Sequence, residues 1–216
     1  YGNGTIKTDL AKRSQFLQAS AVMNLLFHGP RQIWQFGELG YDYSINYNGR
    51  TGRKPIRWDY FDIPERKKVY ETYSRLLWLR NKLPNTFHRD FDNPSGTKTD
   101  LSNQLKRFHF YNAVGDTAVT VVANTGNSVV TGSPDFNQST SNQWYDYFSG
   151  TMQTVSNSMT FQPGEYHVYF NKKPILQNPT FTANAYITST IVADTSTLYL
   201  DFSEPNLSNN TNRFLG

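Results

Sequence analysis

The residues best suited to chemistry gather in one segment of this 216-residue chain, from Gly37 to Asp62. The segment combines carboxylates, amides and guanidinium groups with six aromatic side chains. Arginine and asparagine offer directional hydrogen-bond donors, and an aromatic face covers apolar ring surface. A pyranose sugar requires this mixture, so we expect sugar recognition here. The candidate substrate-binding residues are Glu38, Asp42, Arg50, Arg53 and Trp58.

Two other interpretations of the segment remain open. Its arginines could pair with its acids and simply hold a long loop still. Glu38 and Asp42 could also be imagined as the carboxylate pair of a glycosidase. The acid of such a pair needs a raised pKa, whereas arginine partners would keep both groups ionised. We therefore assign neither residue a catalytic role. A phosphate site is less favoured, because it would require a glycine-rich turn at a helix N-terminus.

Other kinds of site find little support in the sequence. The chain has four histidines and no cysteine, and the histidines lack metal-ligand spacing. His109 and His167 fall inside predicted strands, where a surface or hydrogen-bonded structural position is expected. No serine, histidine and acid occur in a nucleophile-elbow context. We expect no metal site and no nucleophilic triad.

Composition restricts the partners. Lysine and arginine total 21 against 17 acidic residues, which gives a net charge of +4. No basic run exceeds three residues, so we expect no nucleic-acid partner. No apolar run is long enough to cross a membrane. The aromatic content of 15% is the most unusual feature of the composition.

The elements that must position the loop are predicted on both sides of it. Apolar residues at helical spacing predict a helix over Thr8–His28, which Gly29-Pro30 would end. Arg31–Phe36 is short and rich in strand formers, so we predict a buried strand. A second helix is predicted over Ile63–Lys82, with Asp62 as its N-cap. The intervening loop would then lie at the carboxyl end of the strand, where α/β proteins place their sites.

The sequence changes character near Asn85. Short β-type runs separated by Gly, Asn, Asp, Ser and Pro continue to Lys172, as in an antiparallel β-sandwich. In Pro163–Phe170 the side chains alternate with period two, Tyr166, Val168 and Phe170 against Glu165, His167 and Tyr169. After Lys173 the composition shifts to Asn, Thr and Ser.

The stretch "GPRQIWQFGELGYDYSIN…GRKPIRWDYF" resembles the end of the catalytic barrel in the α-amylase superfamily, glycoside hydrolase family 13. The resemblance rests on Gly37-Glu38-Leu39-Gly40 after a Gly-Pro turn and on the run from Arg53 to Asp59. It implies the last helix–strand–helix portion of a (β/α)8 barrel followed by an antiparallel β-sandwich. The implied domains are 1–84, the barrel part, 85–173, the C-terminal β domain, and 174–216, a linker or the start of a further module.

The resemblance also implies roles and a substrate class. Glu38 is similar to the family's loop glutamate beside the eighth strand, and Arg53 to its loop arginine near the outer subsites. The family's three catalytic carboxylates lie on earlier strands, so this chain resembles a fragment that lacks them. The implied parent is a retaining glycosidase or transferase acting on α-glucans. No cofactor is expected in this fragment, and calcium is a candidate cofactor of the parent.

Two rival functions remain. Relatives that lose the carboxylates become non-catalytic carbohydrate-binding proteins, and a β-sandwich can also be a structural accessory domain without a ligand. We expect a secreted, periplasmic or cell-surface bacterial protein, because the absence of cysteine is compatible with bacterial export.

Overall fold

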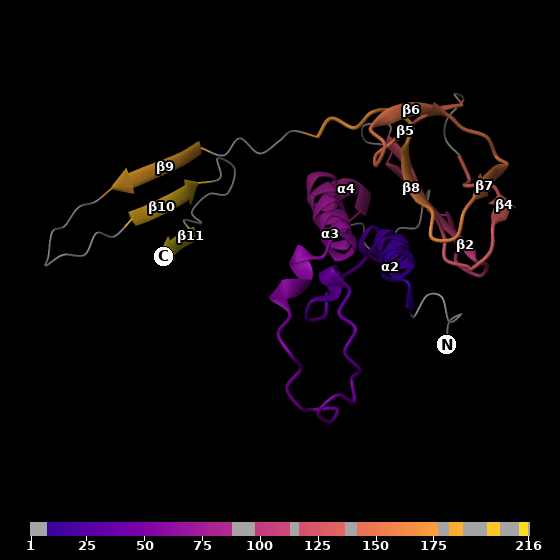
Figure 1. Ribbon diagram of the computed structural model, residues 1–216. Coiled ribbons are helices and arrows are strands. Elements are labelled where there is room, and N and C mark those ends of the chain that lie inside the picture. Colours follow the sequence, from indigo (N-terminus) through magenta and orange to yellow (C-terminus); the bar gives the residue numbers. More distant parts are fainter. Residues whose placement is uncertain are drawn as a thin grey trace, which may run out of the picture. The chain divides into compact units, whose positions relative to one another are not determined.

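The computed structural model describes residues 8–87, 98–112, 117–136, 142–176, 182–187, 198–203 and 212–215. The chain divides into two compact units, Tyr1–Ile175 and Leu176–Gly216. The first unit contains the helices and two antiparallel sheets, and Figure 1 shows its elements in chain order. This unit carries all the candidate site residues.

Two long helices form where the apolar spacing predicts them. Helix α2 spans Leu10–Leu25, and the Asp9 carboxylate caps it by accepting a hydrogen bond from the Lys12 backbone amide at 3.0 Å. Helix α3 spans Pro64–Lys82, and the short helix α4 spans Pro84–Phe87. Helices α2 and α3 pack against each other. The predicted cap at Asp62 is wrong: Ile63 occupies the N-cap position without a side-chain hydrogen bond.

Segment Arg31–Phe36 is not a strand, which corrects the prediction. A strand needs a neighbouring strand that satisfies its backbone N–H and C=O groups. Within the part of the chain that the structure describes, no strand pairs with this segment. Guanidinium groups instead bind the backbone that precedes the segment, at the end of α2. Arg80 of α3 donates to the carbonyls of Leu25 and Phe27 at 2.7 and 2.6 Å, and Arg31 donates to the carbonyl of Asn24 at 2.5 Å.

Two short 3-10 helices frame the predicted loop. The first, η1, spans Gly37–Leu39, and the second, η2, spans Trp58–Asp62. Both make their main helical contacts with α3. Between them the chain makes a long excursion away from the helices, drawn in purple in Figure 1. The loop is thus held against α3 at both of its ends, while its middle projects away from the helices.

The main sheet has six antiparallel strands in the order β1-β2-β3-β8-β5-β6. Its strands are β1 Lys98–Asp100, β2 Leu105–Asn112, β3 Thr117–Asn124, β5 Gln143–Asp146, β6 Thr151–Thr154 and β8 Tyr166–Phe170. Strands β4 Val130–Gly132 and β7 Met159–Phe161 form a separate antiparallel pair. All of these strands lie in the region from Asn85 to Lys172 for which the sequence predicts short strands.

Strand alternation divides the sheet into two buried faces. One face carries Phe108 and Phe110 of β2, which contact Phe27 and Phe87 from the helical part. The opposite face packs against the β4–β7 pair. The hydrophobic core on that side consists of Leu105, Ala118, Val122, Trp144, Val155, Phe161 and Tyr169. The result is a β-rich unit with helices on one face of the main sheet and the small sheet on the other.

Polar contacts also join the helices to the sheet. The Arg75 guanidinium of α3 donates to the Tyr147 carbonyl at 2.9 Å, and the Tyr147 hydroxyl donates to the Arg75 carbonyl at 3.0 Å. The Tyr166 hydroxyl of β8 donates to the side-chain oxygen of Gln18 in α2 at 2.9 Å. The expected boundary between residues 84 and 85 therefore lies inside one compact unit, and its status as a domain boundary stays a prediction.

The second unit contains three antiparallel strands in the order β11-β10-β9. They are β9 Thr182–Ile187, β10 Leu198–Ser203 and β11 Asn212–Leu215. This sheet lies in the region for which the sequence indicates a linker or the start of a further module.

Candidate functional site

The two ends of the loop meet in a small hydrophobic core. Phe36, Leu39 and Tyr60 are its buried members, and Tyr41, Tyr43 and Ile63 pack against it. The Tyr41 hydroxyl donates to the Pro55 carbonyl at 2.6 Å and closes the base of the excursion. Phe36 has a left-handed backbone with φ of 53°, which turns the chain sharply into η1.

Arg66 of α3 holds this core to the helices. The side chain is buried, and it donates to the carbonyl of Leu39 at 3.0 Å and to that of Gly40. Its guanidinium carbon lies 3.7 Å from the centroid of the Tyr60 ring. Backbone acceptors, a carboxylate and an aromatic face thus surround one buried cation, which is the environment that offsets its desolvation.

Asp42 is the carboxylate in that environment. It accepts from Arg66 of α3 at 2.7 Å, from Arg13 of α2 at 3.2 Å and from the Tyr60 hydroxyl at 2.5 Å. Partial burial alone would raise the pKa of Asp42, but the hydrogen bonds from Tyr60 and Arg66 lower it below its ordinary value. Burial, together with the Asp42 hydrogen bond, raises the pKa of Tyr60 to about 12. The carboxylate is therefore ionised and committed to three protein donors.

A second arginine lies on the other side of Tyr60. The Arg57 guanidinium forms a two-pronged pair with Asp59, with N–O distances of 2.6 and 2.8 Å, and donates to the Tyr43 hydroxyl at 2.8 Å. Its central carbon lies 4.1 Å from the Tyr60 ring centroid. Arg57 and Asp59 are an arginine–acid pair within the loop, of the kind that one interpretation of the sequence predicts. Asp42, in contrast, takes its arginines from the helices.

Trp58 is the most exposed aromatic side chain of the loop, with 72% of its surface accessible. It packs edge-to-face on buried Phe36, with ring centroids 4.8 Å apart at 81°. Beyond Phe36 the aromatic contacts continue through Tyr41, Tyr43 and Tyr47 at centroid distances of 5.8, 5.4 and 4.9 Å. Trp58 thus presents indole surface to solvent while one core residue holds the ring in place.

The remaining candidates lie apart from the Asp42 network. Arg50 and Arg53 are exposed, and Arg50 lies within the tight turn that the Gly52 amide closes on the Gly49 carbonyl. Glu38 is half-buried in η1, close enough to Tyr73 of α3 that its charge, with burial as the larger cause, raises the pKa of that tyrosine. The expected proximity of Glu38 to Arg53 stays a prediction, as do the substrate-binding roles of all five candidates.

The network contains residues that sequence reasoning missed. Arg13 and Arg66 belong to helices and contact the loop from 29 and 24 residues away. Arg66 is buried although it lies in the first turn of α3 beside two exposed basic residues, Lys67 and Lys68. Nothing in the local sequence spacing distinguishes it from them. Chemically the arrangement offers fixed guanidinium groups, tyrosine hydroxyls and one exposed indole face. It offers no pair of free carboxylates.

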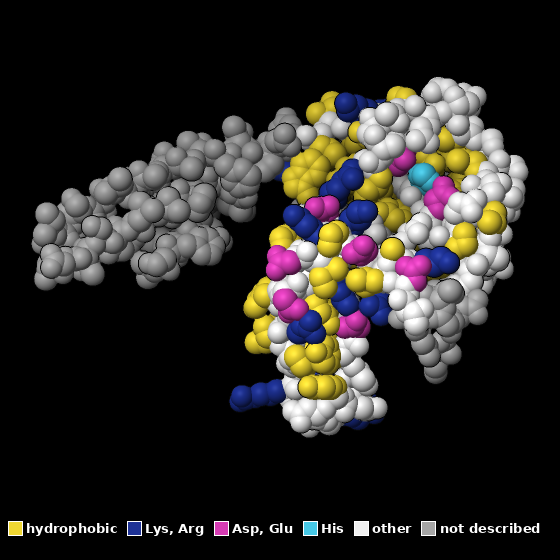
Figure 2. All heavy atoms as spheres, in the orientation of Figure 1, with side chains coloured by type: hydrophobic (Ala, Val, Ile, Leu, Met, Phe, Trp, Pro, Cys, Tyr) yellow, Lys and Arg dark blue, Asp and Glu magenta, His cyan; other side chains and the backbone are white. Residues whose placement is uncertain are grey.

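Apolar surface surrounds this region. Large hydrophobic side chains are exposed on and beside the loop, and Figure 2 shows hydrophobic groups gathered over α3 and the loop on the visible face. The most exposed of them are Trp58, Ile56, Trp34 and Ile45, with 72, 68, 66 and 57% accessible surface. Such a concentration is typical of a surface that contacts another molecule or another part of a protein.

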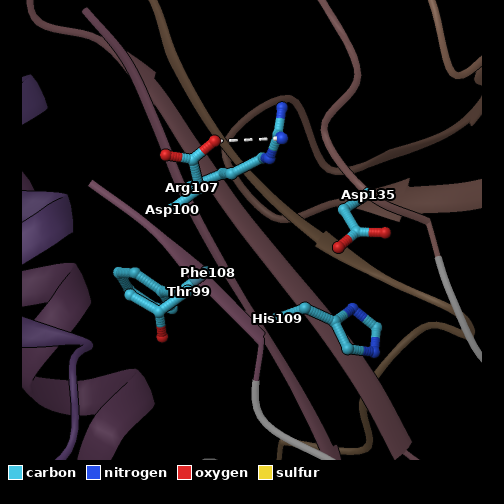
Figure 3. A pocket seen from close by; sticks show the side chains of 6 residues that line it. All are labelled: Thr99, Asp100, Arg107, Phe108, His109 and Asp135. Carbon is cyan, nitrogen blue, oxygen red and sulfur yellow. Dashed lines mark ion pairs between the residues drawn. The ribbon is translucent and has the colours of Figure 1, made fainter. Parts of the chain in front are cut away.

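A separate pocket lies at the β1–β2 edge of the main sheet. It has a volume of about 350 Å³ and is lined by Thr99, Asp100, Arg107, Phe108, His109 and Asp135. Figure 3 shows the ion pair that joins Arg107 to Asp100 across the two strands, at 3.1 Å. Phe108 is buried, so the pocket lacks an exposed aromatic face, and the loop around Trp58 is the better candidate for sugar binding.

Metal binding and membrane insertion find no support in the described residues. No group of three or more histidine or acidic side chains there is arranged to hold a metal ion. Neither long helix in that part of the chain is apolar enough to cross a bilayer.

Comparison with solved structures relates the fold to amylases. The chain matches the structure of AmyP in complex with maltose with a TM-score of 0.54 and 14% identity, covering 78% of this chain and 36% of AmyP. A substituted AmyP in complex with maltotriose gives a TM-score of 0.54 and 14% identity over 74% and 35%. An Anoxybacillus α-amylase gives a TM-score of 0.48 and 13% identity over 71% and 31%.

Sequence-level comparisons add nothing to this likeness. No protein-family model matches the chain, and no curated protein matches it significantly. The chain spans about a third of the length of the AmyP chains that it resembles. It therefore shares the fold of one part of an amylase-type glycoside hydrolase.

Proposed function

We propose that this chain is part of an α-amylase-type glycoside hydrolase acting on α-glucans such as starch, glycogen or maltooligosaccharides. The observation that carries the proposal is the likeness to AmyP over more than two thirds of this chain. AmyP was solved with maltose and, in a substituted form, with maltotriose. A secreted, periplasmic or cell-surface location fits such a polymeric substrate and belongs to the same proposal.

Within that enzyme the loop Gly37–Asp62 forms one border of the α-glucan site. Trp58 supplies a stacking face for the apolar side of a glucose ring, and Arg50 and Arg53 supply donors for its hydroxyls. Asp42 fixes the loop, because its oxygens accept hydrogen bonds from Arg13, Arg66 and Tyr60, and its contact with the sugar stays a prediction. Glu38 supports the start of the loop from η1.

Hydrolysis requires carboxylates beyond this chain. A retaining glycosidase uses two carboxyl groups about 5–5.5 Å apart, one of them protonated. Asp42 is ionised and engaged, and Asp59 is paired with Arg57. We therefore assign the catalytic pair of the proposed enzyme to carboxylates other than these two, outside this chain. The rival function is a carbohydrate-binding protein of the same fold without catalysis, and the loop's exposed indole is compatible with both.

The test is whether the chain binds an α-glucan in preference to a β-glucan without hydrolysing it. Isothermal titration of the purified chain with maltoheptaose should give weak binding, with a Kd on the order of millimolar, because only one border of the site is present. The β-linked cellohexaose is the matched control and should bind less well. Maltoheptaose should remain intact after prolonged incubation. Equal binding of both sugars would contradict the α-glucan assignment. Turnover abolished by Glu38→Gln or Asp42→Asn would contradict the assignment of catalysis to carboxylates outside this chain.

A further inference from the structure

His167 of β8 lies between two carboxylates. Its Nδ1 is 3.1 Å from Oδ2 of Asp146 in β5, and its Nε2 is 3.0 Å from Oε1 of Glu165. Its ring stacks on Tyr169 of the same strand, with centroids 5.1 Å apart and planes 12° from parallel. The histidine occupies the sandwich side of the sheet, far along the chain from the candidate sugar site.

The two contacts determine the charge of the ring. Two ionised carboxylates offer acceptors only, so both ring nitrogens must carry protons to bond with them. Asp146 is ionised: burial alone would raise its pKa, but the His167 hydrogen bond lowers it below the ordinary value. In a neutral imidazole one ring nitrogen carries a lone pair instead of a proton. That lone pair would face a carboxylate oxygen at about hydrogen-bond distance, and two acceptors repel each other. The geometry therefore fits an imidazolium.

Glu165 connects this cation to a turn. Its second carboxylate oxygen accepts from the Gln162 backbone amide at 2.6 Å. The turn is also joined to β3, because the Gly164 amide donates to the Asn124 carbonyl and the Asn124 amide to the Glu165 carbonyl, at 2.9 and 2.8 Å. One carboxylate thus links the imidazolium to the backbone of the turn Gln162–Glu165.

Helix α2 rests on that same turn. Gly164 has a φ of +77°, and a Cβ built there would lie 3.0 Å from the side chain of Gln15 in α2. Tyr166, the first residue of β8 and two positions after Gly164, hydrogen-bonds Gln18 about one turn further along the helix. The position of the turn therefore determines how closely helix and sheet approach.

We propose that His167 is a pH-dependent tie, which fixes the turn Gln162–Glu165 against helix α2 when protonated and releases it when neutral. Loss of the proton removes the attraction to Glu165 and leaves a lone pair facing one carboxylate. The half-buried Glu165 side chain then moves to solvent, because Asp146 is the more deeply buried partner. The close packing of Gly164 on Gln15 loosens as a consequence.

The groups around the ring define the pH window. Asp146 faces it from β5, Glu165 from the turn and Tyr169 from β8, while β6 contributes neutral Gln153 and β7 the Phe161 ring. Arg107 of β2 is two strands away from His167. Val122 of β3 lies between them and is the register partner of both, and Arg107 pairs with Asp100.

Burial alone would lower the pKa of His167, but its two carboxylate partners raise it above 6.5. The stabilisation is therefore complete below pH 6.5 and lost as pH rises through the folded-state pKa. At the acid end it is lost as Asp146 becomes protonated, below pH 3.8.

The first measurement is the titration of His167 in the full chain, followed by ¹⁵N NMR of the imidazole nitrogens. We expect both nitrogens to be protonated at pH 6.5, and Glu165→Gln to lower the titration midpoint of His167. In parallel, His167→Gln should lower Tm by about 3–6 °C at pH 5.5, and the difference should shrink above the titration midpoint. His109→Gln is the control, because it removes another buried strand histidine and should keep the wild-type pH slope.

Hydrogen exchange then tests the link to the turn. The protection factor of the Gly164 amide should fall at least about tenfold across the His167 titration, whereas that of the Tyr147 amide, bonded to the Val168 carbonyl, should not change. Parallel Tm curves for wild type and His167→Gln would overturn the proposal. A neutral ring at pH 6 would also overturn it, and this readout needs no folded variant. Constant Gly164 protection across the titration would contradict the coupling to α2.

Discussion

Asp42 joins three elements through a single carboxylate, since Arg13, Arg66 and Tyr60 come from α2, α3 and η2. Removing its charge would leave the buried Arg66 guanidinium with backbone carbonyls and an aromatic face but without a counter-charge. An unbalanced buried charge costs more than a lost surface pair. At the residue scale, this carboxylate is the group on which the shape of the loop depends most.

Asp42→Asn should therefore lower the free energy of unfolding by about 1–2 kcal/mol at pH 7, measured by urea denaturation. The pKa of Asp42 is lowered in the folded state, so its stabilisation is present above pH 3.8 and lost as pH falls through the folded-state value. The variant should accordingly show a shallower loss of stability between pH 5 and pH 2 than the wild type.

Asp59→Asn is the matched control, because Asp59 also pairs with an arginine but its side chain is 58% exposed. Its loss should be clearly smaller than that of Asp42→Asn, because solvent screens an exposed pair. Equal losses for the two variants would show that Asp42 contributes no more than an ordinary surface ion pair.

The types of these residues could be predicted from the sequence, but their partners could not. Arginine–acid pairing inside the loop was one of the interpretations that composition allowed, and Arg57 with Asp59 confirms it. The two arginine partners of Asp42 are more than twenty positions away on helices, and their approach depends on how α2 and α3 pack. Local spacing carries no information about such contacts.

At the scale of the element, Gly40 lets the loop leave η1 beside helix α2. Its φ is +66°, and a Cβ there would lie 2.7 Å from Cδ1 of Leu17 and 3.6 Å from the Arg66 guanidinium. Gly40→Ala adds backbone strain and a side-chain collision, so it should destabilise the protein by about 2–4 kcal/mol in thermal or urea unfolding.

Gly49→Ala separates the two effects. Gly49 has a φ of +76° in the same loop, but no atom lies within 4 Å of an added Cβ. We expect it to cost only about 1–2 kcal/mol, from backbone strain alone. If the two alanine variants lose the same stability, the contact between the loop and Leu17 is not a determinant of the fold.

Elements with their own periodicity or capping were predictable, and elements that need a neighbour were not. The apolar spacing predicted both long helices to within about three residues at most ends. Alternation predicted β8, with Tyr166, Val168 and Phe170 on the helix side. The strand prediction for Arg31–Phe36 is wrong because composition can favour extended backbone without supplying a partner strand to pair with it.

At the scale of the molecule, the sequence change near Asn85 separates two kinds of secondary structure within one compact unit, Tyr1–Ile175. Arg75 with Tyr147, Phe27 with Phe108 and Gln18 with Tyr166 all cross from the helices to the sheet. In the sequence, the apolar residues of such an interface cannot be told from those of an ordinary core. Composition alone therefore does not reveal that the helices pack on the sheet.

We propose that the loop Gly37–Asp62 of this amylase-like fold is an α-glucan surface on which Trp58 is the stacking platform. The most direct measurement is a titration of the ¹⁵N-labelled chain with maltoheptaose, comparing the wild type with Trp58→Ala and with Trp34→Ala, which removes a similarly exposed indole. We predict shifts concentrated in residues 37–62, and a loss of at least about tenfold in affinity for Trp58→Ala alone. Shifts confined to the β1–β2 pocket, or equal losses in both variants, would contradict the claim.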